Sequence, residues 1–178
     1  MKKISMMIMA IAIAMGANAQ SYNIGTSSTT RDIYGNRTTT HRNQYGMTTG
    51  TSISSMDSYG NENTTHRNRY GSTIGTSTTY TDSYGNTTTT HRDRYGVTTG
   101  TSTSYTDAYG NTNTTYSDRR GISTGYSTTY DDGYGNSTTT YRNRYGQTRG
   151  TSTSSYDAYG NRNTQQRSDD LNTIIWSW

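Results

Sequence analysis

The 178-residue chain contains no cysteine, no proline and no phenylalanine. Without cysteine, neither a disulfide nor a thiolate zinc site can hold the fold together. Without proline, the chain lacks the residue that most often interrupts strand pairing. Aliphatic residues are also scarce, because Val97 is the only valine and Leu171 the only leucine. A conventional hydrophobic core would be hard to build from this composition, so stability must come from repetition.

The N-terminal stretch differs from the rest of the chain. Residues 1–19 contain two lysines, an apolar run from Ile4 to Met15 and the small-residue ending Ala17-Asn18-Ala19. This pattern predicts a signal peptide cleaved between Ala19 and Gln20, and therefore a secreted or bacterial cell-surface protein. The apolar run is shorter than the roughly 20 residues that a membrane-spanning helix needs, so we expect no transmembrane segment in the mature chain.

The charge of the mature chain is close to balanced. Removing Lys2 and Lys3 leaves 14 basic and 12 acidic residues, a net charge of +2. Arginines and aspartates alternate along the sequence, which favours a mixed, solvated surface. We therefore expect no nucleic-acid partner, since such a partner requires clustered basic residues.

A 25-residue repeat fills residues 25–170, after a short lead-in at residues 20–24. Repetition at this period is typical of an array of identical structural units. The six copies begin at Gly25, Gly50, Gly75, Gly100, Gly125 and Gly150.

Each copy contains the motif D-x-Y-G-N, and most copies carry a second version eleven residues later, as in Asn43-Gln44-Tyr45-Gly46. Asp or Asn three residues before Gly favours a type I turn in which glycine takes a positive φ in a G1 bulge. We therefore expect two turns per repeat. The structural residues of the first turn are Asp32 and Gly35, Asp57 and Gly60, Asp82 and Gly85, Asp107 and Gly110, Asp132 and Gly135, and Asp157 and Gly160.

The segments between the turns are rich in threonine and tyrosine, which favour strands. They predict an all-β fold, preferably an antiparallel hairpin meander, with a β-solenoid and a disordered chain as alternatives. In-register solenoid rungs would stack like charges about 4.8 Å apart, which disfavours that arrangement. A meander with an odd repeat needs one extra residue per copy to keep its faces, and the glycine inside the longer segment (Gly50, Gly75, Gly100) marks the expected bulge.

The last eight residues, 171–178, read LNTIIWSW. They predict an apolar C-terminal strand that caps the last repeat, with docking to a partner as the alternative. The segment also looks like the aromatic-ended final strand of outer-membrane barrels, but the repeats lack the apolar outward face that such barrels require.

Two resemblances follow from the repeat. The phrases Tyr156-Asp157-Ala158-Tyr159-Gly160-Asn161-Arg162 and Tyr105-Thr106-Asp107-Ala108-Tyr109-Gly110-Asn111 resemble the YD repeat of Rhs-type cell-surface and toxin-shell proteins. That resemblance implies extracellular β-hairpins without catalysis by the repeats. The composition is similar to that of curli-like functional amyloid subunits, which are exported and rich in Gly, Ser, Thr, Asn and Gln. This second resemblance implies self-association.

The histidines and aspartates predict no metal or cofactor site. His41, His66 and His91 share one repeat position, and a single histidine per copy, expected on the strand surface, provides too few ligands for a metal. Each turn offers one carboxylate, fewer than calcium usually requires. No charged cluster interrupts the repeat, so we expect neither catalytic residues nor an enzyme.

The tyrosines of the D-x-Y-G-N motif are the candidate contact surface, with a tyrosine ladder that packs the sheet as the alternative. The sequence thus predicts a structural or adhesive protein of the bacterial surface that binds glycans, matrix or cell-surface proteins. A functional-amyloid-like fibre subunit is the alternative, and the threonine rows suggest ice binding less strongly. The candidate tyrosines are Tyr34, Tyr59, Tyr84, Tyr109, Tyr134 and Tyr159.

Overall fold

A computed structural model describes residues 22–169, which form twelve β-strands. The signal peptide (1–19) and the C-terminal strand (171–178) predicted above lie outside these residues, as does part of the lead-in. The strands are β1 (Tyr22–Arg31), β2 (Arg37–Asn43), β3 (Thr48–Met56), β4 (Glu62–Asn68), β5 (Thr73–Thr81), β6 (Thr87–Asp93), β7 (Thr98–Thr106), β8 (Thr112–Asp118), β9 (Ser123–Asp131), β10 (Ser137–Asn143), β11 (Thr148–Tyr156) and β12 (Arg162–Ser168).

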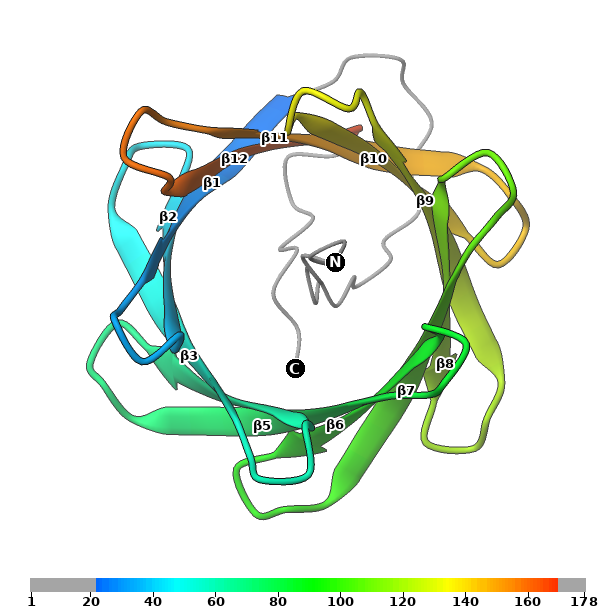
Figure 1. Cartoon of the computed structure of the whole chain (residues 1–178), viewed down its shortest axis with the longest axis horizontal. Coiled ribbons are helices and arrows are strands. Elements are labelled where there is room, and N and C mark those ends of the chain that lie inside the picture. The colour runs from blue at the N-terminus through cyan, green and yellow to red at the C-terminus, as the bar shows by residue number, and fades with distance from the viewer. Residues whose placement is uncertain (1–21, 170–178) are drawn as a thin grey trace.

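Each strand pairs antiparallel with its neighbours in sequence, and β12 pairs with β1, so the sheet closes into a barrel (Figure 1). The predicted antiparallel meander is confirmed, and the solenoid alternative is wrong. Closure was not predicted. It follows from the twist and coiling of a long meander, which bring its first and last strands together and remove both free edges.

A β-bulge in each repeat keeps the two faces of the sheet in phase. Between β2 and β3, His41 pairs with Gly50 and Arg42 with Thr48, which leaves Thr49 as the extra residue. The same shift recurs at each of the remaining long strands, β1, β5, β7, β9 and β11. The bulge predicted at the strand glycine is therefore confirmed, because the extra residue directly precedes that glycine.

Close backbone approach explains the glycine beside the bulge. A Cβ built on Gly50 would lie 2.3 Å from the backbone oxygen of Arg67 on the neighbouring strand. Gly25, Gly100 and Gly150 are equally close to the matching carbonyls. The sheet can keep its register here only when this position has no side chain.

Burial alternates along the strands and separates an inner face from an outer face. On β4, for example, Glu62, Thr64 and His66 are buried, and the residues between them are only half-buried. The long strands contribute glycine, serine and, as at Thr79, threonine to the inner face, and the short strands contribute larger side chains such as Glu62 and His66. This alternation of small and large residues is one way in which barrels fill their interior.

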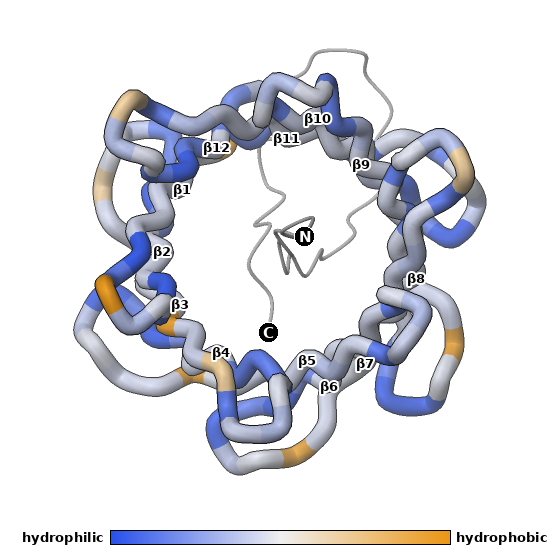
Figure 2. Tube along the Cα trace, viewed as in Figure 1, coloured by the Kyte–Doolittle hydropathy of each residue, from blue (hydrophilic) through white to orange (hydrophobic). Residues whose placement is uncertain are grey.

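The barrel is polar throughout. Tyr141 is the one buried hydrophobic side chain among the described residues. In Figure 2 most of the tube is blue to white, and orange is confined to short stretches, several of them on the outer loops. Among residues 22–169, no helix has the length and apolar character needed to cross a membrane.

Candidate functional site

The D-x-Y-G-N turns all connect an odd strand to the following even strand, so the up-and-down topology places all six at one end of the barrel. We call this end the tyrosine rim. It consists of the turns at residues 32–36, 57–61, 82–86, 107–111, 132–136 and 157–161.

Hydrogen bonds within the turn explain its local geometry. The amide of Gly35 donates to the carbonyl of Asp32 at 3.1 Å, and Gly35 takes a φ of 86°. Oδ1 of Asp32 accepts from the amides of Tyr34 and Asn36, each at 2.9 Å, and Oδ2 accepts from Nδ2 of Asn36 at 2.8 Å. The Asn36 side chain is the main reason that the pKa of Asp32 lies below its ordinary value.

The fifth turn departs slightly from this geometry. Gly133, which occupies the variable position, also takes a positive φ of 77°, and its amide donates to Oδ1 of Asp131. Asp132 still accepts from the amides of Tyr134 and Asn136. The aspartate cap therefore persists even where the backbone of the turn changes.

The turn directs its tyrosine away from the sheet. The six candidate tyrosines are 84–93% exposed, and within the described part of the chain none of their hydroxyl groups makes a hydrogen bond. They lie in turns and not on strands, so the tyrosine-ladder alternative is wrong for this set. The structure brings Tyr34, Tyr59, Tyr84, Tyr109, Tyr134 and Tyr159 together on the tyrosine rim.

The opposite end, which we call the arginine rim, carries the second set of turns at residues 43–47, 68–72, 93–97, 118–122 and 143–147. These turns use the same backbone device, with an Asn or Asp that accepts from two amides and a glycine at positive φ. Three of their four tyrosines, however, have an arginine stacked on the ring. The guanidinium of Arg69 lies 4.6 Å from the ring centroid of Tyr70, and Arg94 on Tyr95 and Arg144 on Tyr145 repeat this contact.

Charges segregate between the two ends of the barrel. The half that includes the tyrosine rim has eight carboxylates and three arginines, and the other half has eleven arginines and three aspartates. The expected mixed surface is therefore wrong. Aspartates and arginines that alternate in sequence separate in space, because consecutive turns lie at opposite ends.

The three histidines form a chain with serines on the inner face. Ser52 Oγ lies 2.9 Å from His41 Nε2 and 2.9 Å from His66 Nδ1. Ser77 Oγ continues the chain, 2.7 Å from His66 Nε2 and 3.3 Å from His91 Nδ1. Each serine can donate to one ring and accept from the next when the three rings share a tautomer.

Burial controls the charge of these histidines. They are 2–8% exposed, so the expected position on the strand surface is wrong. Desolvation lowers the pKa of His41 to about 4, and desolvation together with the other two histidines lowers that of His66 to about 3. No cluster of three or more metal-binding side chains occurs within residues 22–169.

Other residue types occupy the same inner position in the last three copies. Tyr116 donates to or accepts from Ser127 at 3.0 Å, and Tyr141 pairs with Ser152 at 3.1 Å. Burial raises the pKa of Tyr116 to about 12 and raises that of Tyr141 further. Gln166 takes the sixth position and is 1% exposed. We call this ring of His, Tyr, Gln and Ser side chains the inner girdle.

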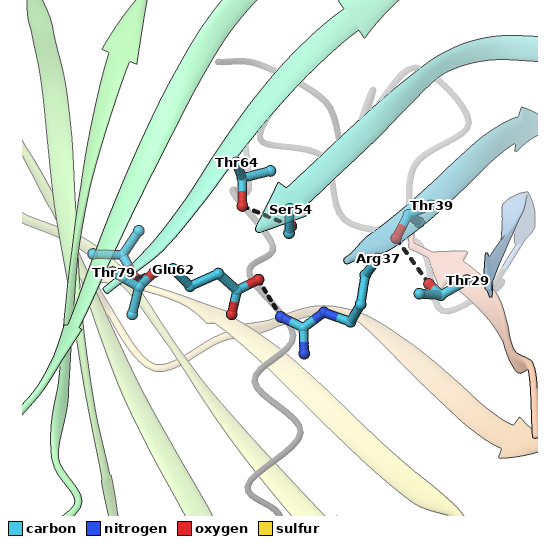
Figure 3. A network of polar contacts seen from close by, with 8 residues as sticks. Thr29, Arg37, Thr39, Ser54, Glu62, Thr64 and Thr79 are labelled. Carbon is cyan, nitrogen blue, oxygen red and sulfur yellow. Dashed lines mark hydrogen bonds and ion pairs between the residues drawn. The ribbon is translucent and has the colours of Figure 1, made fainter. Parts of the chain in front are cut away.

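A second inner layer lies nearer the tyrosine rim (Figure 3). Hydroxyl pairs such as Thr29 with Thr39 and Ser54 with Thr64 are 2.8 Å apart. Arg37 forms an ion pair with Glu62, the equivalent residue one repeat later. This pair was not predicted from the sequence, although opposite charges at one repeat position were a visible signal.

The outer wall has an open hollow. It has a volume of about 610 Å³ and spans β10, β11, β12, β1 and β2. Hydroxyl and amide side chains line it, with Arg42 as the charged residue. It presents no acid or base for catalysis.

No family model matches the chain, and no curated protein matches it.

Proposed function

We propose that this protein is an exported structural or adhesive element of the bacterial surface, and that the tyrosine rim is its contact surface. One observation carries the proposal. Each repeat places a tyrosine on the same rim, and all six side chains are at least 84% exposed. Scattered exposed aromatics are normal, but a repeated set at one end of a protein indicates an interaction surface.

Tyrosine suits a weak, repeated contact. Its ring offers apolar area and its hydroxyl a hydrogen bond, and few rotatable bonds become ordered on binding. Six equivalent contacts on one scaffold add through multivalency, so that useful attachment needs no deep pocket. Glycans, matrix proteins and cell-surface proteins are the partner classes that such a rim fits.

The remaining hypotheses have less support. A cross-β fibre assembles through free strand edges, whereas the closed sheet leaves no strand edge unpaired within residues 22–169. Ice binding calls for a flat grid of threonines, and the outer threonines follow the curved wall that Figure 1 shows. The resemblance to YD repeats is consistent with extracellular hairpins and does not extend to a partner.

Adhesion is tested with the exported protein on surfaces coated with cellulose, chitin, mucin or fibronectin. The test variant carries serine at all six tyrosines of the tyrosine rim. We expect it to lose about 10²-fold or more in apparent affinity for the surface that the native protein binds, because avidity depends on many simultaneous contacts.

The matched control replaces Tyr45, Tyr70, Tyr95 and Tyr145 on the arginine rim with serine. It should bind as the native protein does. Unchanged binding of the six-fold variant would overturn the proposal. So would native protein that adheres to none of the four surfaces.

A further inference from the structure

The two rims carry opposite charge. Among the described residues, the half with the tyrosine rim has an excess of five negative charges, and the half with the arginine rim has an excess of eight positive charges. The rim aspartates are held by amide groups, which have no formal charge, so these interactions leave their negative charge in place. The barrel therefore has an acidic end and a basic end.

The two rims also match in spacing. On each rim the turns recur once per two strands, which corresponds to about 10 Å around the wall. One repeat sets both spacings, so a turn on one rim can lie opposite a turn on the other. The residue types match as well, because exposed tyrosine rings on one rim would meet arginines on the other, a favourable cation–π combination.

From these observations we propose that the barrels stack end to end, with the tyrosine rim of one copy on the arginine rim of the next. Such a contact joins two different surfaces of the same molecule, so it does not close and extends into a linear array. The inference rests on the proposed function in one respect, namely that the tyrosine rim is a contact surface. It identifies a second copy of this chain as a partner of that rim.

Charge controls this contact, so salt tests it directly. The size of the exported protein is measured by sedimentation at increasing concentration, in about 10 mM and about 1 M salt, where the Debye length is about 30 Å and about 3 Å. We expect concentration-dependent arrays at low salt and monomers at high salt.

A variant with Arg69, Arg94 and Arg144 replaced by glutamate tests the contribution of the arginine rim alone. The substitutions lower the excess of positive charge in that half from eight to two and change the net charge of its five turns from +3 to −3. This variant should therefore remain monomeric alone. Its tyrosine rim is intact, so it should still bind the arginine rim of native protein and shorten native arrays when added in a small proportion. Replacement of the same three residues by lysine keeps the charge and is the matched control, which should still assemble.

Several outcomes would overturn stacking. These are native protein that stays monomeric at low salt, arrays that persist equally in high salt, and a glutamate variant that assembles as native protein does. A monomeric protein whose arginine rim instead binds heparin would assign that rim to an acidic polymer. Adhesion is a separate readout, because the monomeric glutamate variant should still bind the coated surface if the proposed function is correct.

Discussion

The two rims of the barrel share one turn and differ in what that turn displays. Asp57 to Asn61 on the tyrosine rim and Asn68 to Ser72 on the arginine rim share the hydrogen bonds that involve backbone amides and the same left-handed glycine. Yet Tyr59 is 88% exposed without a ring contact from any described residue, whereas Tyr70 carries Arg69 on its face. A repeat with two hairpins therefore gives one chemistry to each end, while the backbone stays uniform.

We expect the barrel wall, the tyrosine rim and the asparagine turns of the arginine rim to respond to acid at different pH values. The folded-state pKa of His41 is about 4, below the ordinary 6.5, so its contribution to stability is complete above pH 6.5 and declines as the pH falls toward 4. This one residue accounts for about 3 kcal/mol by the linkage between pKa and stability. We expect the free energy of unfolding, measured with urea, to fall over this range.

Below about pH 4 the turns of the tyrosine rim should also lose stability. The pKa of Asp32 is lowered in the folded state, so its stabilising effect is present above 3.8 and is lost as the pH falls through the folded value. Asn43, Asn68 and Asn143 do not titrate, so their turns should not respond.

The control for the loss of stability between pH 6.5 and 4 replaces the three histidines with glutamine, the residue at position 166. If that variant keeps the native pH profile between 6.5 and 4, the inner girdle is not its cause.

Each long strand has its bulge glycine near the arginine rim and has no equivalent glycine near the tyrosine rim. Gly50→Ala should destabilise the barrel by about 1–3 kcal/mol, because the new Cβ would meet a backbone oxygen that cannot move without breaking the pairing. Ser55→Ala, on the outer face at the other end of the strand, should change the free energy of unfolding by less than about 0.5 kcal/mol. Equal effects of the two substitutions would contradict the bulge.

The turn glycines should respond alike on both rims. Gly60 and Gly71 have φ values of 81° and 82° with open space around them, so alanine at either position is strained only by its backbone. Each substitution should cost about 1–2 kcal/mol in thermal unfolding followed by circular dichroism. A large cost on one rim with none on the other would show that the turns differ in conformation.

The smallest effect concerns the tyrosines themselves. Tyr84→Ser should leave the free energy of unfolding within about 0.5 kcal/mol of native, since the ring touches little. Tyr70→Ser should cost slightly more, because it removes the ring under Arg69, a contact worth about 0.5–1 kcal/mol at exposed sites. The reverse order would indicate that the tyrosine rim packs against part of the fold.

Local features of this fold could be predicted from the sequence because they depend on a few adjacent residues. Asp32 and Gly35 specify a turn, and Gly50 marks the bulge. These turns and bulges fix the register between consecutive strands, and that register produces the meander.

Closure and burial could not be predicted in the same way. The strands that meet at the seam have the same sequence pattern as every other pair, so nothing local indicates that β12 joins β1. Both faces are polar, so no hydrophobic period indicates that His66 lies inside and Arg67 outside. The available signal was size, because Ser52 and Gly75 lie opposite His66 and leave room for it on one face.

Cysteine pairs test the closed barrel most directly, since the chain contains no cysteine of its own. Ser28 and Asn163 are partners across the seam between β1 and β12. We expect Ser28→Cys with Asn163→Cys to form an intramolecular disulfide on oxidation of dilute protein. Ser28→Cys with Ile53→Cys, equivalent positions one repeat apart, should not, because a strand separates them. A disulfide in the second pair and none in the first would contradict the barrel and indicate stacked rungs.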